Sequence, residues 1–235
     1  MGKAAPILAL ISGTVALLGL AGAYFGILAP LSGFYCFALG ALVGGSITVL
    51  VSLLAVFIAR GGRDPDGMRL AVAGLAVGVG LVLIVLTAAA PGGGLPPIND
   101  ITTDLENPPE FAPPSVVPDY VDRSMSYPQE FVDQVREAYP DLQSIRVDTP
   151  PQELYEKALA TAIDLGWEIT AQSDERLVFD AKEETALFRF VDDITVRVVG
   201  KSPGSKLDIR SKSRDGRGDL GANAARIRRF TEAMQ

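Results

Sequence analysis

Three long apolar stretches occupy the first 90 residues, and they constrain the fold of this chain more than any other feature. They run from about Pro6 to Ala29, from Leu31 to Ala59 and from Leu70 to Ala90, and none contains Asp, Glu, Lys or Arg. A helix needs about 20 apolar residues to cross a hydrocarbon core about 30 Å thick. Core helices of a water-soluble protein would keep a polar face, and these stretches have none. The sequence therefore predicts three transmembrane helices in the lipid bilayer.

Positive charge at the membrane edges predicts the orientation of these helices. The basic residues there are Lys3, Arg60, Arg63 and Arg69. The first of them precedes the first stretch, the others lie between the second and third, and the link at 29–33 carries no charge. Because cytoplasmic loops are enriched in Lys and Arg, we expect a cytoplasmic N-terminus. Three spans then place residues 91–235 in the periplasm of a bacterial inner membrane.

The first stretch has a second interpretation, as a cleaved secretory signal. Lys3, the apolar run and the small residues Ala21-Gly22-Ala23 resemble such a signal and its cleavage site. The apolar run continues through Tyr24–Leu28, however, and the positive region before it is a single lysine. We favour an uncleaved helix, and both alternatives place the C-terminal part of the chain outside the cytoplasm.

Each apolar stretch contains one pair of glycines at GxxxG spacing. The pairs are Gly22/Gly26, Gly40/Gly44 and Gly74/Gly78. Small residues at this spacing let helices approach closely, so the pairs predict association with a partner membrane protein or as a homo-oligomer. In the alternative, Gly and Ala are simply common in this region. Transporters and proton channels usually place ionisable groups inside the bilayer, and their absence from these stretches argues against both functions.

Composition excludes several function classes for residues 91–235. This part has 26 Asp and Glu against 17 Lys and Arg, a balance that argues against nucleic acid as a partner. The chain contains no histidine, which removes the Ser-His-Asp, Cys-His and HExxH chemistries. The single cysteine, Cys36, lies in the second apolar stretch, so the exported part has no disulfide and no zinc-binding thiol. We expect no cofactor, no metal site and no catalytic residue. Paired carboxylates or a Ser/Lys arrangement would remain for catalysis.

A proline-rich segment follows the apolar region. Residues 91–118 contain eight prolines and a glycine triplet, which is typical of an extended tether. Part of it is expected to pack on the following domain through apolar anchors. These are Ile98, Ile101, Leu105 and Phe111. The predicted organisation is a membrane region at 1–90, a partly packed tether at 91–127 and an extracytoplasmic domain at 128–235.

Residues 128–235 alternate between helical and strand patterns. Apolar residues at helical spacing predict helices at 129–139, 151–166 and 220–233. Alternating or β-branched runs predict strands at 145–148, 167–172, 176–181, 193–200 and 206–212. Residues 186–191 form either a further strand or the start of the one at 193. We expect an α+β domain in which an antiparallel sheet of four to five strands carries helices packed on one face.

Turn and capping residues predict local details of this domain. Thr149 is expected to cap the helix at 151, and Gly166 to end it in a left-handed conformation. The KSPGS turn at 201–205 predicts a hairpin in which Val199 pairs with Lys206. The residues expected on the core face of that hairpin are Ile194, Val196, Val198, Leu207 and Ile209. The apolar stripe expected on the last helix is Leu220, Ala224, Ile227, Phe230 and Met234.

A basic, glycine-containing loop leads into the N-terminus of the last predicted helix. Free N–H groups and the helix dipole favour an anion there, which Arg214 and Arg217 could clamp. The candidate anion-binding residues are Arg210, Arg214, Arg217, Asn223 and Arg226. In the alternative that we favour, Asp219 caps the helix, and the basic residues pair with acidic residues of the same domain. The expected pairs join Arg210, Lys212 and Arg214 to Asp192, Asp193 and Asp208. Asn223, near the apolar stripe, is expected to bond the backbone of the loop.

Polar residues of structural importance are expected beside this loop. They are Asp192, Asp193 and Asp219. The first two are adjacent carboxylates after an aromatic segment, and two carboxylates can share general acid and base roles. Adjacent residues of a strand point to opposite faces, which argues against a joint catalytic role.

Five segments together resemble a known family. They are Asn99-Asp100-Ile-Thr-Thr103, Pro108-Pro109-x-Phe111, Gly166-Trp167, Phe190-Val-Asp-Asp193 and Arg210-Ser-x-Ser-Arg-x-Gly-x-x-Asp-x-Gly-x-Asn223-x-x-Arg226-Ile227. The resemblance is to the uncharacterised bacterial and plastid family called domain of unknown function 1499, over about residues 95–235. It implies that the segment at 99–111 belongs to the domain. It implies no activity, because none is established for the family, and it leaves the apolar region unexplained.

The sequence favours a membrane-anchored extracytoplasmic interaction or ligand-binding module of the cell envelope. The alternative is an enzyme of lipid or cell-wall chemistry that uses residues 210–223 to hold an anionic group. An enzyme predicts a cleft at that loop with an unpaired carboxylate or serine in reach. A binding module predicts an apolar cavity or an exposed apolar patch.

Overall fold

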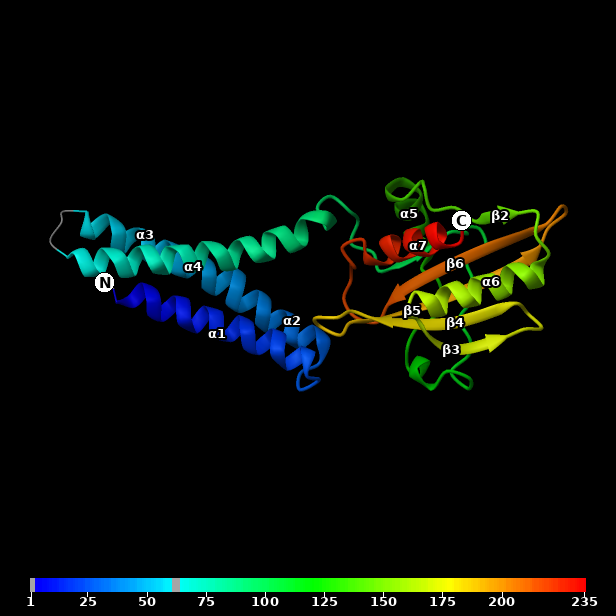
Figure 1. Ribbon diagram of the computed structural model, residues 1–235, viewed down its shortest axis with the longest axis horizontal. Helices are drawn as coiled ribbons and strands as arrows, with labels where there is room; N and C mark the ends of the chain where they lie inside the picture. The colour runs from blue at the N-terminus through cyan, green and yellow to red at the C-terminus, as the bar shows by residue number, and fades with distance from the viewer. Residues whose placement is uncertain (1–2, 61–63) are drawn as a thin grey trace. The chain divides into compact units, whose positions relative to one another are not determined.

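The computed structural model describes residues 3–60 and 64–235 and divides the chain into two compact units (Figure 1). The helical unit comprises Met1–Gly93 with Thr185–Arg189, and the sheet unit comprises Gly94–Glu184 with Phe190–Gln235. Arg63, one of the basic residues used to predict the orientation, lies outside the described residues.

Three long apolar helices make up most of the helical unit, as predicted. Their elements are α1 (Ala4–Tyr24), α2 (Pro30–Ala38), a π-helical segment η1 (Leu39–Gly44), α3 (Gly45–Ala59) and α4 (Pro65–Ala89). The elements from α2 to α3 form one continuous helix, Pro30–Ala59. Each of the three helices is long and apolar enough to cross a membrane by length and composition. Proline in the first turn of α2 and α4 and the Asp64 cap of α4 account for where these helices begin.

Glycines bring the helices of this unit into close contact. A Cβ added to Gly40 would lie 2.5 Å from the backbone nitrogen of Ala16, and one added to Gly78 would lie 3.0 Å from the carbonyl oxygen of Gly45. Two of the three predicted GxxxG pairs therefore pack against neighbouring helices of the same chain. Gly26 does not take part in such packing, because it has a φ of 69° in the turn after α1. Association with a second protein through these faces stays a prediction.

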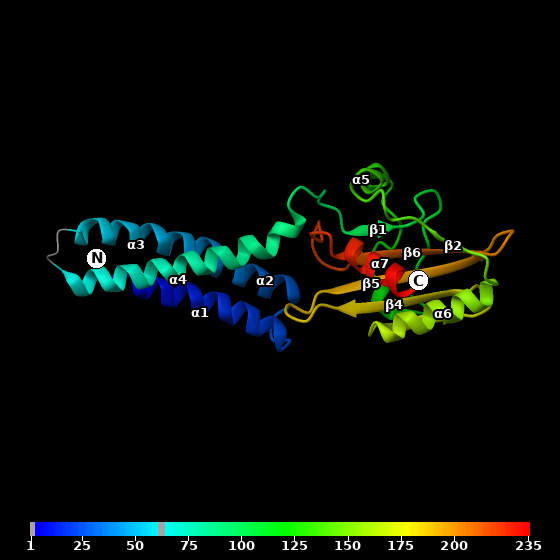
Figure 2. The ribbon, with the colours of Figure 1, turned by 45° about the horizontal axis from the view of Figure 1, so that its top comes forward.

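The sheet unit is built on an antiparallel sheet of six strands, in the order β1-β6-β5-β4-β3 with β2 also paired to β6 (Figures 1 and 2). The strands are β1 (Asp100–Thr102), β2 (Ile145–Val147), β3 (Glu168–Ser173), β4 (Val178–Glu184), β5 (Val191–Gly200) and β6 (Ser205–Ser213). The prediction of four to five strands was one strand short, because β1 comes from the proline-rich segment. Residues 186–190 form no strand, and β5 begins at Val191.

The predicted register of the last hairpin is confirmed. Val199 pairs with Lys206, and Arg197 opposes Asp208. Alternation along β5 and β6 then places one set of side chains toward the core. The five residues predicted for that face are all buried there: Ile194, Val196, Val198, Leu207 and Ile209.

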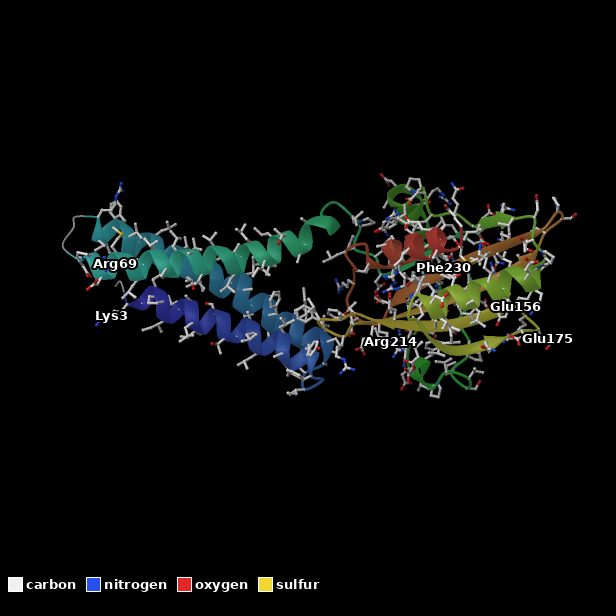
Figure 3. All side chains as sticks on the ribbon, viewed as in Figure 1. Lys3, Arg69, Glu156, Glu175, Arg214 and Phe230 are labelled. Carbon is white, nitrogen blue, oxygen red and sulfur yellow. The ribbon has the colours of Figure 1, made fainter. Side chains whose placement is uncertain are left out.

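Helices cover this apolar face of the sheet. They are α5 (Val132–Ala138), α6 (Pro151–Asp164) and α7 (Ala222–Ala233), and each contributes buried residues to the same core. Trp167, which follows α6, stacks on Phe230 of α7 with ring centroids 5.1 Å apart. Figure 3 labels Phe230 within this layer. Burial of these large apolar side chains is the main force that holds the layers together.

Two predicted helix starts were wrong. The residue at the N-cap of α6 is Pro150, and Thr149 makes no side-chain capping bond. Leu220 was expected in the stripe of α7, but it precedes the helix with a φ of 53° and is 56% exposed. The left-handed Gly166 after α6 is confirmed, with a φ of 83°.

Candidate functional site

The face of the sheet opposite the helices is lined with charged side chains. They come from β4, β5 and β6 and are Asp180, Asp193, Arg197, Lys206, Asp208, Arg210 and Lys212. Residues 103–127, here called the cover segment, lie over this polar face and contact it at many points. The cover segment falls within the region that the sequence predicts to be a partly packed tether.

Arg210, one of the candidate anion-binding residues, is fully buried on the polar face. Its side chain is 1% exposed and donates two hydrogen bonds, of 2.8 and 2.7 Å, to the two carboxylate oxygens of Asp100. It also donates to the carbonyl oxygens of Pro109 and Met125. The rings of Phe111 and Tyr127 lie 4.9 and 5.2 Å from its guanidinium carbon. Arg210 therefore joins β6, β1 and the cover segment.

The other basic residues of the polar face are also paired with carboxylates. Arg214 forms hydrogen bonds to both oxygens of Asp193 and to Asp119, which lowers the pKa of Asp119. Asp193 also accepts a 2.7 Å hydrogen bond from Arg123 of the cover segment. Lys212 contacts Asp100 at 3.1 Å, so the carboxylate partner of Arg210 has two cations.

A second charged cluster ties the cover segment to β5 and β6. Arg197 and Lys206 both contact Asp104 and Asp208. Burial acts to raise the pKa of Asp104, but the hydrogen bond from Lys206 and the neighbouring positive charges bring it below its ordinary value. Asp208 accepts a further hydrogen bond from the Ser144 hydroxyl.

Asn223 and Arg226 lie on the opposite, helix-covered side of the sheet. The Asn223 side chain donates to Ser213 and accepts from Ser211, at 2.9 and 2.6 Å. Both serines belong to β6, and they bind Asn223 through their side chains. The expectation that Asn223 bonds the backbone of the loop was therefore wrong. Arg226 forms ion pairs with Asp192 at 2.5 Å and with Glu183 at 2.6 Å.

The candidate anion-binding residues therefore do not meet in one cavity. Arg210 lies on the polar face, whereas Asn223 and Arg226 belong to α7 on the opposite side of the sheet. Asp219 accepts hydrogen bonds from the N–H groups of Gly221 and Asn223, so it occupies the start of the helix where an anion was expected. Arg217 is exposed in the loop. Anion binding here stays a prediction, and the geometry favours the alternative of internal pairing. Arg214 pairs with Asp193 as expected, but the prediction was wrong for Arg210 and Lys212, which both pair with Asp100.

The polar face also contains a groove that the sequence did not predict. It has a volume of about 540 Å³ and lies between the cover segment and strands β3 to β5. Its walls and floor include Phe111, Val116, Ala171, Val178, Asp180 and Arg197.

Asp180 is a buried carboxylate in this groove. The residue is 1% exposed, and its Oδ2 accepts hydrogen bonds from the Ala112 N–H at 2.7 Å and from the Tyr120 hydroxyl at 3.4 Å. Its Oδ1 has no hydrogen-bond partner among the residues that the structure describes. Burial raises the pKa of Asp180 to about 6, against the lowering effects of the Ala112 N–H and of the Thr195 and Tyr120 hydroxyls. No local pattern indicated its burial, because alternation along β4 places Asp180 on the face opposite the buried Phe179.

Comparison with family models assigns the sheet unit. The model described as "Protein of unknown function (DUF1499)" matches residues 100–234, more than half of the chain. This match confirms the family resemblance seen in the sequence. It begins at β1 and includes the whole cover segment, so both belong to the family domain. No curated protein matches the chain.

Proposed function

We propose that this chain, which belongs to the family described as "Protein of unknown function (DUF1499)", is a membrane-anchored binding module of the bacterial cell envelope. In this proposal the three apolar helices span the inner membrane with the N-terminus in the cytoplasm. The sheet unit works in the periplasm and binds a ligand or partner protein at the groove that contains Asp180.

The surface of the helical unit supports membrane insertion. Large apolar side chains face outward along all three helices, among them Leu10, which is 71% exposed, and Leu50, which is 67% exposed. Such a surface is costly in water and suited to lipid. Lys3 and Arg69 lie at the same end of this unit, as Figure 3 shows, and that end is the one we place in the cytoplasm.

The groove supports binding as the function of the sheet unit. It joins apolar walls to a buried carboxylate oxygen that has no partner within the described part of the chain. A pocket that holds a ligand usually combines apolar lining with a few polar groups that orient it. The enzyme alternative relies on the loop at 210–223, where Arg210, Arg214 and Arg226 already bind carboxylates of this chain. No observation on that loop favours catalysis.

Purification of the full chain in a mild detergent, followed by mass spectrometry of the bound lipids and proteins, tests this proposal. Ala171→Trp fills the groove from β3, and Ala160→Trp places the same side chain on the exposed surface of α6 as a matched control. We expect a species that co-purifies with the wild type and Ala160→Trp and is lost from Ala171→Trp. Recovery of the same set of species with Ala171→Trp would contradict binding at the groove.

A further inference from the structure

The groove contains a buried carboxylate, that of Asp180. Among the described residues, no Lys or Arg forms an ion pair with Asp180. Arg197 lines the same groove, but Asp104 and Asp208 bind its Nη2, and no hydrogen bond within the described part of the chain joins it to Asp180. Its Nε has no hydrogen-bond partner among the described residues. A buried carboxylate without a cation is unfavourable, and a positively charged ligand group would remove this cost.

The groove opens beside an unpaired edge of the sheet. Within the described part of the chain, β3 is the last strand on this side, and no further strand pairs with its outer edge. A bulge lies between Ile169 and Ala171, which leaves Ala171–Ser173 as the regular part of the edge. These same three residues line the groove. The backbone N–H and C=O groups of such an edge can pair with an added peptide strand.

The distance from this edge to Asp180 selects the ligand side chain. Asp180 pairs with Ala171, so it lies one strand further into the sheet. A strand added beside β3 would lie two strand spacings, about 10 Å, from the backbone of β4. An extended lysine reaches about 6 Å from its Cα, a hydrogen bond adds about 3 Å, and the Asp180 carboxyl group extends about 3 Å from its own Cα, so the three lengths together cover this distance. The methyl group of Ala171 leaves the path between them open, whereas a serine or asparagine would fall short.

We propose that the groove binds an extended peptide segment of a partner protein, which adds a strand to β3 and places a lysine or arginine side chain against Asp180. This inference rests on the proposed function and names its ligand class. The aliphatic stem of the basic side chain lies along Phe111, Val116 and Val178, and its charged end meets the free oxygen of the carboxylate. The acidic balance of residues 91–235 favours the approach of a basic segment.

Fluorescence polarisation with a synthetic peptide tests this inference on the full chain in a zwitterionic detergent. The probe is a fluorescein-labelled nonapeptide of alternating threonine and serine with one central lysine. We expect saturable binding that weakens at least tenfold with Asp180→Asn. Glu175→Gln neutralises an exposed acid in the turn after β3 and is expected to leave the affinity unchanged.

Two altered peptides separate charge, reach and strand pairing. Replacement of the lysine by diaminopropionic acid keeps the positive charge on a one-carbon stem, and we expect at least a tenfold loss of affinity. Methylation of alternate backbone nitrogens removes the donors that pair with β3, and we expect binding to disappear. Equal binding of the methylated peptide would overturn the strand addition and assign the groove to a free cationic ligand, such as a lipid amine.

Other outcomes would overturn the inference directly. They are the absence of peptide binding to the wild type and an unchanged affinity in Asp180→Asn. If the peptide fails while a co-purifying species still depends on an open groove, the proposed function stands and the peptide inference alone is wrong. If the peptide does not bind and no co-purifying species depends on an open groove, the proposed function and the peptide inference are both wrong.

Discussion

Replacement of Asp180 by asparagine is expected to stabilise the sheet unit at neutral pH. Burial raises the pKa of this carboxyl from 3.8 to about 6, a change of about two units. At about 1.4 kcal/mol per unit, the ionised carboxylate costs the folded state about 3 kcal/mol at pH 8. Asparagine removes the charge but leaves an amide group without an assured partner, which costs about 1 kcal/mol. The expected net gain for Asp180→Asn at pH 8 is therefore about 2 kcal/mol.

The sign of the effect depends on pH. Between pH 4 and 6 the folded chain keeps a proton on Asp180 that the unfolded chain has released. The contribution of this group to stability is therefore most favourable below pH 4 and falls as the pH rises through 6. At pH 4 the wild-type carboxyl is neutral in the folded state, and the advantage of asparagine disappears. The variant is then expected to be about 1 kcal/mol less stable than the wild type.

Urea unfolding of the full chain in detergent measures this difference. Trp167 is the only tryptophan, and it is buried against Phe230, so its fluorescence reports on the core of the sheet unit. Glu175→Gln is the control and should change the free energy of unfolding by less than about 0.5 kcal/mol at either pH. If the free energies of unfolding of Asp180→Asn and wild type differ by the same amount at pH 4 and pH 8, the argument that ionisation of Asp180 destabilises the folded state is refuted.

Two matched pairs of variants test the packing of each unit. Arg210→Met leaves the buried Asp100 short of its bidentate partner and is expected to cost about 3–5 kcal/mol in the same urea assay; for the exposed Arg217→Met we expect less than about 0.5 kcal/mol. Equal effects would contradict the structural role of Arg210. In α1, Gly19→Leu places a side chain against the backbone of α2, 2.5 Å from its nearest atom, and should lower the thermal stability of the helical unit in detergent. Gly13→Leu meets no atom within 4 Å and should not; similar melting temperatures for the two variants would refute the close packing.

Much of the fold could be predicted because local patterns and one turn determine it. The uncharged length of the apolar stretches predicts three long helices. The KSPGS turn and the alternation around it predict the register of β5 and β6, since a shift by one residue would turn the apolar set outward. Gly166 ends α6 as expected, because a left-handed residue there is most easily a glycine.

The polar face could not be predicted from such patterns, because its partners are distant in the sequence. Asp100 and Arg210 are 110 residues apart, and the segment of Asp100 has a composition typical of a tether. The apolar anchors of this segment predicted that part of it packs on the domain, and the family resemblance indicated that residues 99–111 belong to it, but neither predicted which side chains they meet on the polar face. Successive side chains of a strand point to opposite faces, and Phe179 is buried in the core. Alternation therefore places Asp180 on the outer face of β4. Its burial depends on the cover segment, which no local propensity predicts.

The compartment of the sheet unit is the most direct test of the account as a whole. In a Cys36→Ser background, single cysteines at Asp66 and Glu156, both exposed, report on the two sides of the proposed membrane. A maleimide that cannot cross the inner membrane is added to cells with a permeabilised outer membrane. We predict labelling of Glu156→Cys in these cells and labelling of Asp66→Cys only after lysis. The opposite pattern, or labelling of both cysteines before lysis, would contradict a membrane-spanning anchor that presents its binding domain to the periplasm.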